Sequence, residues 1–304
     1  MKWKNSFKKG SLAAFVTLAL TGSALAMPTG GTVENGSVNV DAANFGANDA
    51  IANVANGATI TPQTNSIINW EAFNIAQGEA LHFNTTNAAL LNRVTGAQMS
   101  ELLGQMTQVG GNFLYLVNPN GIHIGGTASF DVSNLTLSTL NVASEDFLSY
   151  VTSAKPYLPS QQDAAKGAKA ITVDQGAHFN VVNSLTFRSG KVTVADGVTF
   201  VMAPGMNKAE LNVLAEEKSN QEGSKSSSTK TTTAQGNEVS FHGTVESDAN
   251  RWVDMDFKGA TVNLDRAKFH TPNGELSVQA TQSSEDNLDG SWTETATATN
   301  VIQA

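Results

Sequence analysis

The apolar residues of this chain fall in short runs, and each run is bounded by residues that favour turns. Gly, Asn and Asp separate the runs, whereas strong helix formers are sparse. Short runs rich in β-branched and aromatic residues between turn residues are typical of strands. The pattern therefore predicts many short strands, among them 38–40, 67–68, 113–117, 135–140, 192–194 and 262–264.

A repeat of 21 residues relates two neighbouring segments, 171–181 and 192–202. Both follow one frame: an aliphatic residue, Thr, Val, two further residues, Gly, two further residues and Phe. A weaker echo relates 38–45 to 262–269. Strand composition at this period predicts one coil of a parallel β-helix per repeat, with two or three short strands in each coil. Chance similarity between two hairpins is the alternative.

One stretch departs from this pattern because its apolar residues have helical spacing: Met99, Leu102, Leu103 and Met106. Glycines interrupt the spacing at Gly104, Gly110 and Gly111. Because glycine weakens a helix, we expect an irregular coil here, with a short helical turn as the alternative.

A second stretch, 216–238, has almost no apolar residues, and Ser and Thr with interleaved Lys fill 224–233. Such a segment cannot bury enough apolar surface to offset the entropy that it loses on ordering. We therefore expect a disordered surface loop within one β-helix domain, 27–304. The loop would lie between a main body, 27–215, and a tail, 239–304.

The first 26 residues have the three-part layout of a secretory signal peptide. Four lysines flank the start, an apolar core covers 12–20, and Ala24-Leu25-Ala26 offers a small-x-small cleavage site. The core is shorter than the roughly 20 residues that span a bilayer, which favours a cleaved signal over a membrane anchor. We expect the mature chain to begin at Met27 and to be exported.

Charge limits the expected partners, and the cysteine content limits how the fold can be stabilised. The formal net charge is −9, and removal of the four lysines of the signal takes it to −13. Phosphate backbones repel an acidic chain, so nucleic acid is not an expected partner. The chain has no Cys, so the fold must rest on its core without disulfides.

A series of motifs occupies the first half of the mature chain. Pro28-Thr-Gly-Gly opens it, and five segments follow in order: 65–75, 78–83, 92–96, 110–122 and 138–148. In this order and spacing they resemble the secretion domain of the filamentous haemagglutinin family, which is exported by two-partner secretion (TPS). The resemblance covers 27–205.

The resemblance implies a right-handed parallel β-helix whose N-terminus is capped by extra strands. It also implies recognition in the periplasm by an outer-membrane transporter of the Omp85 type, and a final location outside the cell or on its surface. The family's signature turn and its Asn-Arg-Val segment fall on positions of this sequence. The residues so marked for transporter recognition are Asn118, Pro119, Asn120, Gly121, Asn92 and Arg93.

The Asn-Pro-Asn-Gly segment has a physical interpretation of its own. Asn118 favours the first position of a type I turn, Pro119 fixes φ at the second, and Gly121 favours the fourth. The apolar run 113–117 before the turn predicts a strand buried on both faces, and the alternation in 122–124 predicts a half-buried strand after it. The segment is therefore expected to form a tight corner, with a structural role, a recognition role or both.

Three further residues have expected roles in this region. Trp70 and Phe73 are too close together for a stacking platform, so we expect them to pack in the core or the cap. Arg93 is one of few arginines, and we expect it to form a structural ion pair with a carboxylate such as Glu71 or Glu79.

The resemblance suggests a surface or adhesive role for a monomer, with a host or surface receptor as a further partner. Family members typically continue far beyond the length of this sequence, which ends at Ala304. A truncated N-terminal remnant of a large adhesin or contact-dependent toxin is therefore one alternative.

An enzyme is the other alternative, because parallel β-helices also carry polysaccharide lyases and hydrolases. Asp254, Asp256 and Lys258 alternate on one strand face, although such a stripe is usually a solvated surface. None of the five His residues lies within four residues of another, so no short metal-binding pair is expected. We expect neither catalysis nor a cofactor.

Overall fold

The computed structural model describes residues 27–153, 158, 160–161, 169–202, 208–216, 218–221, 229–232, 237–281 and 297–303. The expected signal peptide, 1–26, lies outside these residues. Part of the stretch expected to be a disordered loop lies outside them too: 217, 222–228 and 233–236.

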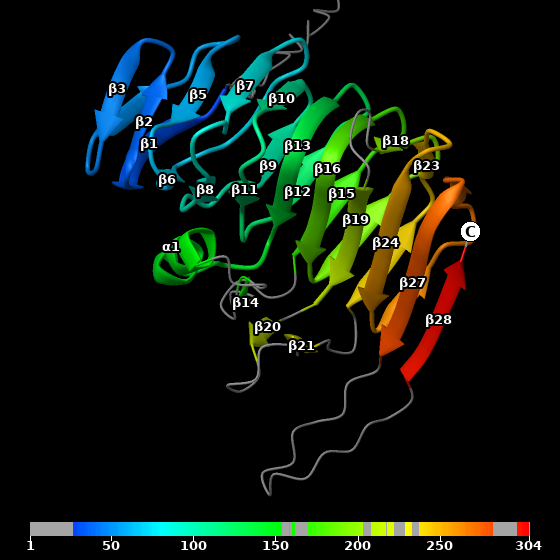
Figure 1. Ribbon diagram of the computed structural model, residues 1–304. Coiled ribbons are helices and arrows are strands. Elements are labelled where there is room, and N and C mark those ends of the chain that lie inside the picture. The colour runs from blue at the N-terminus through cyan, green and yellow to red at the C-terminus, as the bar shows by residue number, and fades with distance from the viewer. Residues whose placement is uncertain are drawn as a thin grey trace, which may run out of the picture.

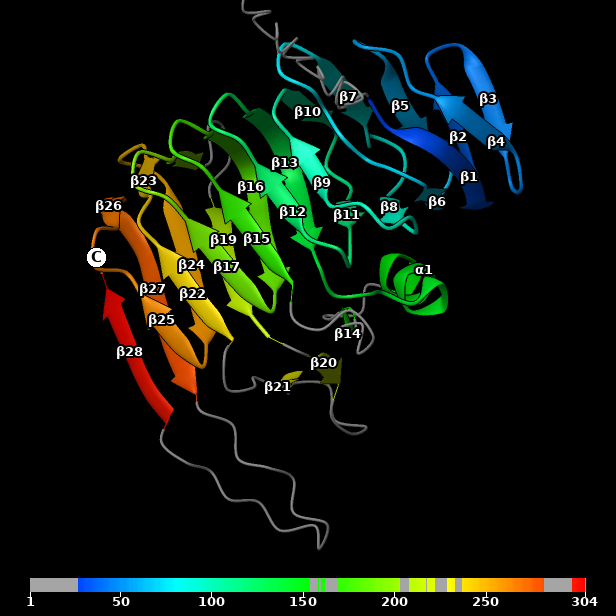
Figure 2. The same cartoon turned by 180° about the vertical axis from the view of Figure 1, so that it is seen from behind.

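Most described residues lie in strands that stack in parallel and form three long faces of a solenoid, seen from two sides in Figures 1 and 2. The strands of the first face pair in parallel from one coil to the next. They are β5 (Thr59–Pro62), β7 (Ala80–Asn84), β10 (Gln105–Val109), the first half of β13 (Ser129–Ser138), the first half of β16 (His178–Ser189), β18 (Thr199–Met202), β23 (Thr244–Ser247) and β26 (Lys268–His270).

The second face takes over where β13 and β16 turn a corner, marked in their pairing by a register shift between Val132 and Asn134. Its strands are β6 (Ser66–Trp70), β8 (Leu90–Val94), β11 (Leu114–Val117), the second halves of β13 and β16, β19 (Lys208–Ala215), β24 (Trp252–Gly259) and β27 (Asn273–Thr281). All pair in parallel, and β28 (Thr297–Gln303) then adds to β27 in the antiparallel direction.

The third face closes each coil. Its strands, again parallel, are β9 (Ser100–Leu102), β12 (Ile122–Ile124), β15 (Ala170–Val173), β17 (Lys191–Val194), β22 (Glu238–Phe241) and β25 (Thr261–Asn263). The predicted parallel β-helix is therefore confirmed.

An antiparallel cap covers the N-terminal end of the solenoid (Figure 1). It consists of β1 (Thr29–Asn35), β2 (Ser37–Val40), β3 (Ala43–Gly46) and β4 (Ala50–Asn53). The cap joins the coils through β1 against β6 and β2 against β5, both antiparallel. The echo between 38–45 and 262–269 has no structural counterpart, because β2 and β3 form a hairpin whereas β25 belongs to a parallel face.

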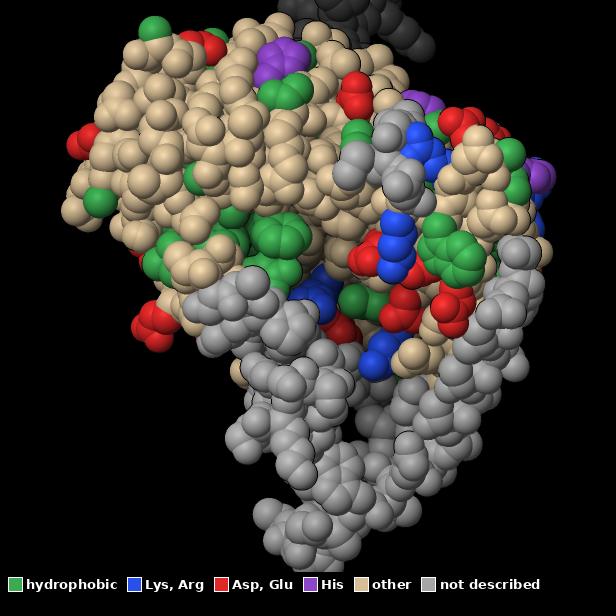
Figure 3. All heavy atoms as spheres, in the orientation of Figure 1, with side chains coloured by type: hydrophobic (Ala, Val, Ile, Leu, Met, Phe, Trp, Pro, Cys, Tyr) green, Lys and Arg blue, Asp and Glu red, His purple; other side chains and the backbone are tan. Residues whose placement is uncertain are grey.

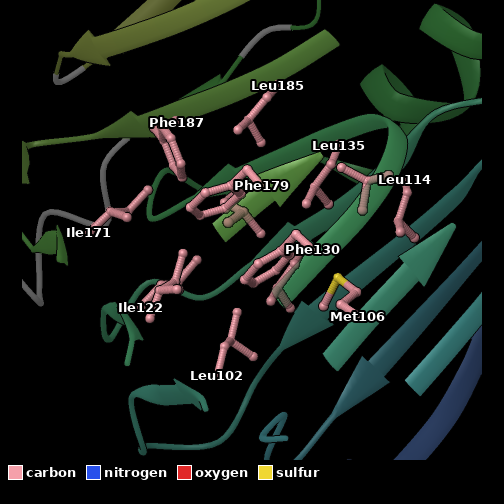
Figure 4. Close-up of a cluster of buried hydrophobic side chains, with 14 of the residues drawn as sticks. Leu102, Met106, Leu114, Ile122, Phe130, Leu135, Ile171, Phe179, Leu185 and Phe187 are labelled. Carbon is pink, nitrogen blue, oxygen red and sulfur yellow. The ribbon is translucent and has the colours of Figure 1, made fainter. Parts of the chain in front are cut away.

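The 21-residue repeat corresponds to one coil of the solenoid. Ile171 pairs with Val192 on the third face, and Phe179 pairs with Phe200 on the first. Phe179 lies inside a stack of rings, with centroids 4.7 Å from Phe130 and 4.8 Å from Phe200. Figure 4 shows Phe130 and Phe179 side by side in the interior, so successive coils stack their rings in one continuous core.

The expectation of an irregular coil at 99–106 is wrong. The stretch with helical spacing forms β9 and β10, because its backbone pairs with the coils on both sides and Leu102 and Met106 point into the core.

The stretch 216–238, expected to be a disordered loop, is described only in part. Its described residues include the buried Glu216, β20 (Lys218–Gln221) and β21 (Thr229–Thr232). β20 pairs with β21 and with β14 (Ser160–Gln161). For the rest of the stretch the loop stays a prediction.

One helix, α1 (Ser144–Ser153), lies outside the solenoid, beside β8 and β11 (Figures 1 and 2). It covers apolar side chains that point outward from the second face. Phe147 on α1 is fully buried and contacts the ring of Tyr115 edge-on, with centroids 5.7 Å apart. An outward apolar patch on an otherwise polar face therefore fixes where the helix docks.

Candidate functional site

The Asn118–Gly121 corner joins β11 to β12. The Gly121 N–H donates to the Asn118 carbonyl at 3.1 Å and closes the turn, and the Asn120 N–H donates to Asn118 Oδ1 at 2.9 Å. Gly121 has φ of +119°, which a residue with a side chain rarely adopts. The predicted tight corner is confirmed, with Asn118 capping it from the first position.

Asn118 is fully buried, and its side-chain amide donates hydrogen bonds to the preceding coil. Its Nδ2 donates to the Gln98 carbonyl at 3.0 Å and to Ser100 Oγ at 2.9 Å. The side chain of Asn118 thus supplies a hydrogen-bond donor to the corner at Gln98 and Ser100, where the preceding coil passes from β8 to β9. Loss of this donor would remove a hydrogen bond from the buried Ser100 hydroxyl, which costs more than the bond itself contributes. The Gln98 carbonyl would keep the Asn120 amide as a donor at 3.3 Å.

Asn120 is the one member of the predicted turn that reaches the surface. Its Nδ2 donates to the Gly96 carbonyl at 2.8 Å and to Asn118 Oδ1 at 2.9 Å, while Pro119 and Gly121 are buried. The two asparagines therefore fasten the 118–121 corner onto the corner of the coil before it. That earlier corner is exposed at Thr95 and from Ala97 to Met99.

Asn92 lies in the interior, one coil before the turn. It accepts a hydrogen bond from Trp70 Nε1 at 3.0 Å and donates to the Tyr115 carbonyl at 3.3 Å. Trp70 is fully buried and contacts Phe73 edge-on, as expected for core packing. Asn92 is therefore a buried polar residue that fixes the position of the Trp70 indole near the capped end.

Arg93 points outward from the same strand and forms a structural ion pair, as predicted, but its partner is Glu34. Nη1 lies 2.9 Å from Glu34 Oε2, and Nη2 donates to the Val142 carbonyl at 2.8 Å and to Ser144 Oγ at 3.1 Å. The expectation named a carboxylate such as Glu71 or Glu79, and neither of these is the partner. The antiparallel cap instead brings β1, which carries Glu34, against β6 and so within reach of β8.

The structure brings the six predicted residues together in two consecutive coils. Asn92 pairs with Leu116 and Arg93 with Val117 across β8 and β11, directly before the turn begins. Of the six, only Asn120 and Arg93 are even partly exposed. The site is therefore a hydrogen-bonded frame, and its accessible surface belongs mostly to neighbours that the motifs do not include.

A family model, described as the TPS secretion domain, matches residues 26–301 of this chain. The chain belongs to this family. The match places the TPS secretion domain over the cap and over the coils on both sides of the Asn118–Gly121 corner. It is a family of secretion domains.

Two curated relatives of this TPS secretion domain come from Haemophilus influenzae. A protein named heme/hemopexin-binding protein is 29% identical over 140 residues, 44% of this chain and 14% of the relative. A second protein of that name is 37% identical over 87 residues, 27% of this chain and 9% of the relative. The chain thus spans a small part of the length of these curated relatives.

The fold of the TPS secretion domain is also seen in a solved structure. The crystal structure of the HMW1 secretion domain from Haemophilus influenzae superposes with a TM-score of 0.58 at 23% identity, over 85% of this chain and 60% of that one. At this identity the likeness concerns the fold alone.

His123 is a residue of the TPS secretion domain that the sequence did not single out. It follows the Asn118–Gly121 corner on β12, with Nδ1 2.5 Å from Glu101 Oε2 and Nε2 2.9 Å from Asp174 Oδ2. Burial disfavours the charged ring, but the hydrogen bonds and charges of Asp174 and Glu101 outweigh it and raise the pKa of His123. The His123 ring thus bridges the coils on either side of its own.

The predicted alternation of Asp254, Asp256 and Lys258 on one face of β24 is confirmed, since Val253, Met255 and Phe257 are buried between them. Figure 3 shows charged side chains of both signs gathering in a hollow over β19 and β24. Burial raises the pKa of Asp256, and the hydrogen bond from Ser277 and the charge of Lys258 only partly oppose it.

A buried ion pair that the sequence analysis did not predict lies near these charged residues. Arg188 Nε on β16 is 2.6 Å from Oε1 of Glu216, the residue that directly follows β19. Arg188 also donates to the Leu158 carbonyl at 3.4 Å and to Ser160 Oγ at 3.3 Å. Burial raises the pKa of Glu216 despite the nearby charges of Arg188 and Lys258.

Within the described ranges, no three His, Cys, Asp or Glu side chains are arranged to hold a metal ion. In the same part of the chain, no helix has the length and apolarity needed to cross a bilayer.

Proposed function

We propose that this chain is the exported member of a two-partner secretion pair, and that an Omp85-type outer-membrane transporter recognises it in the periplasm. The match of the TPS secretion domain over 26–301 is the observation that carries this proposal. The signal-like segment 1–26 supports it, because a cleaved signal would deliver the chain to the periplasm first.

Within that function, the six residues marked by the motifs act mainly by holding a surface in place. Asn118 and Asn92 are too deeply buried for a folded partner to touch. The transporter would instead contact Asn120 and the corner fastened beneath it, where Gln98 and Met99 are exposed. Met99 is 42% exposed, and a methionine on a surface is an adaptable apolar contact.

Outside the cell, we propose a surface or adhesive role with a receptor as partner. A stack of coils presents long, flat faces, and solenoids use such faces to bind extended partners. A monomer suffices for this role, because the faces already run along the whole stack.

Export in the presence and absence of a transporter tests the proposal. The full chain is expressed with and without an Omp85-type barrel from the same organism, and immunoblots compare culture supernatant with periplasm. We expect the chain in the supernatant only when the barrel is present, and N-terminal sequencing should find Met27 first. Equal release without any such barrel would refute the proposal.

Surface variants at the corner test the recognition step separately. Met99→Asp and Asn120→Ala should lower export at least severalfold, while the purified proteins keep a β-rich circular dichroism spectrum and unfold cooperatively. Gln175→Ala is the matched control, because Gln175 is an exposed glutamine at the corner after β15. Normal export of Met99→Asp would place the recognition surface elsewhere on the domain without affecting the transporter requirement.

A further inference from the structure

The outer side of β19, β24 and β27 carries a regular grid of side chains. Their alternate residues, such as Val253 and Met255, point into the core, so the intervening ones point outward. Strand register sets them in rows across the three strands. The rows are Lys208, Trp252 and Asn273; then Glu210, Asp254 and Glu275; then Asn212, Asp256 and Ser277.

Trp252 is the exception in this polar grid, because it is a large ring that is 44% exposed. Its Nε1 donates to Asp254 Oδ1, so the polar edge of the indole is already satisfied. The bond also fixes the orientation of the ring beside the carboxylate row. An exposed aromatic face held rigidly among polar groups is a feature of binding surfaces, since it offers apolar contact at little cost in side-chain entropy.

The groups around the ring accept more hydrogen bonds than they donate. Carboxylates fill the middle row, and the Lys208 ammonium lies 2.7 Å from Asp254 Oδ2 and 3.3 Å from Glu210 Oε1. The Lys208 ammonium already occupies the position between two of these carboxylates, and their remaining lone pairs can accept hydrogen bonds from hydroxyl groups. A ligand with many hydroxyl donors and an apolar face therefore complements both the acceptors and the indole.

One acceptor of the grid has no hydrogen-bond partner in the described part of the chain. It is Asp256 Oδ1, a buried atom in the middle of β24. Buried acceptors are nearly always paired, so this one indicates a missing donor.

We propose that the outer side of β19, β24 and β27 binds a neutral oligosaccharide. One sugar ring lies against the indole of Trp252, and hydroxyl groups donate to the carboxylates of the middle row and to Asp256. Trp252 and Asp256 are four residues apart on one strand, roughly 14 Å, so the ligand spans more than one ring. This site rests on the face of the folded chain and does not depend on the proposed export route.

Binding of defined sugars to the purified full-length exported chain tests the site. Maltohexaose, cellohexaose and chitohexaose are titrated while tryptophan fluorescence and calorimetric heat are recorded, and hexalysine is titrated in parallel. We expect at least one of the neutral sugars to bind with a Kd below about 1 mM. Trp252→Ala should weaken this binding by about tenfold or more, and Trp252→Tyr by less, because tyrosine keeps an aromatic face.

Phe113→Ala is the matched control, because Phe113 is an aromatic residue of similar exposure, 37%, on a different part of the second face. Phe113→Ala should bind the sugar as the unaltered chain does. The melting temperatures of all variants should lie within a few degrees of that of the unaltered chain. Absence of binding by all three sugars, or equal affinity of Trp252→Ala, would overturn the proposal. Binding of hexalysine in place of the sugars would overturn it in favour of a basic peptide.

Discussion

Arg93 on β8 and Glu34 on β1 meet across the junction between the coils and the cap, with 2.9 Å between Nη1 and Oε2. Glu34 also accepts hydrogen bonds from Asn69 Nδ2 at 2.7 Å and from the Ser144 hydroxyl. Burial opposes ionisation of Glu34, but these hydrogen bonds and the charge of Arg93 outweigh it and lower its pKa. One ion pair therefore fastens the cap, the coils and α1 together.

Arg93→Met should lower the free energy of unfolding by about 2–4 kcal/mol, because it leaves a half-buried carboxylate and the Val142 carbonyl without their donor. Urea unfolding at pH 7 measures this. Arg266→Met is the control, since Arg266 is 60% exposed and lies 3.8 Å from Asp265, and it should change stability by less than about 0.5 kcal/mol. Equal effects of the two substitutions would show that the junction is held by backbone pairing alone.

The two asparagines of the corner should differ in cost. Asn118→Ala removes the oxygen that caps the turn and the amide that donates to the buried Ser100 hydroxyl, so it should cost about 2–3 kcal/mol. Asn120→Ala loses bonds at a partly exposed position and should cost about 1 kcal/mol. Thermal and urea unfolding of both proteins decide the order, and a larger loss for Asn120→Ala would contradict the buried-frame interpretation.

The His123 bridge should make stability depend on pH. A group whose folded pKa is raised stabilises the fold fully below its unfolded pKa, about 6.5, and loses this contribution as pH rises through the folded value. His123→Gln should therefore destabilise the domain by about 1–3 kcal/mol at pH 5.5 and by much less at pH 9. Melting curves at both pH values measure the difference. A deficit that stays constant over this range would mean that the imidazolium is not the species that binds Glu101 and Asp174.

The ring stack should dominate the core energetics. Phe179→Ala opens a cavity between Phe130 and Phe200 and should cost about 3–5 kcal/mol. Phe113→Ala removes the same atoms from a partly exposed site and should cost clearly less. Denaturant unfolding of the two proteins provides the comparison, and similar losses would indicate that the core relaxes into the cavity.

The local features of this fold were predictable because each is encoded over a few residues. The repeat at Ile171 and Val192 showed the coil length, and the Asn-Pro-Asn-Gly order showed the corner. The candidate site was found as a set of residues. The burial of these residues was not predicted, since the alternation of polar and apolar residues in one strand does not show which side chains of the next coil will cover it.

The features that sequence reasoning missed all depend on distant partners. Arg93 lies 59 residues from Glu34, and His123 lies 51 residues from Asp174. Helix α1 forms where Phe147 meets an outward apolar patch, which becomes visible only once β8 and β11 are aligned. The polar composition of 216–238 also gave no sign of the pairing of β20 with β21 or of the burial of Glu216, since neither needs apolar side chains.

The coil-on-coil pairing has a consequence for how the chain reaches its native state. Each coil makes its ladder with the coil just before it, and the cap completes the first of these templates. The stack can therefore form coil by coil from the capped end, in the order of the chain. A segment emerging from a pore N-terminus first would find its docking partner already in place, so the fold itself gives assembly a direction.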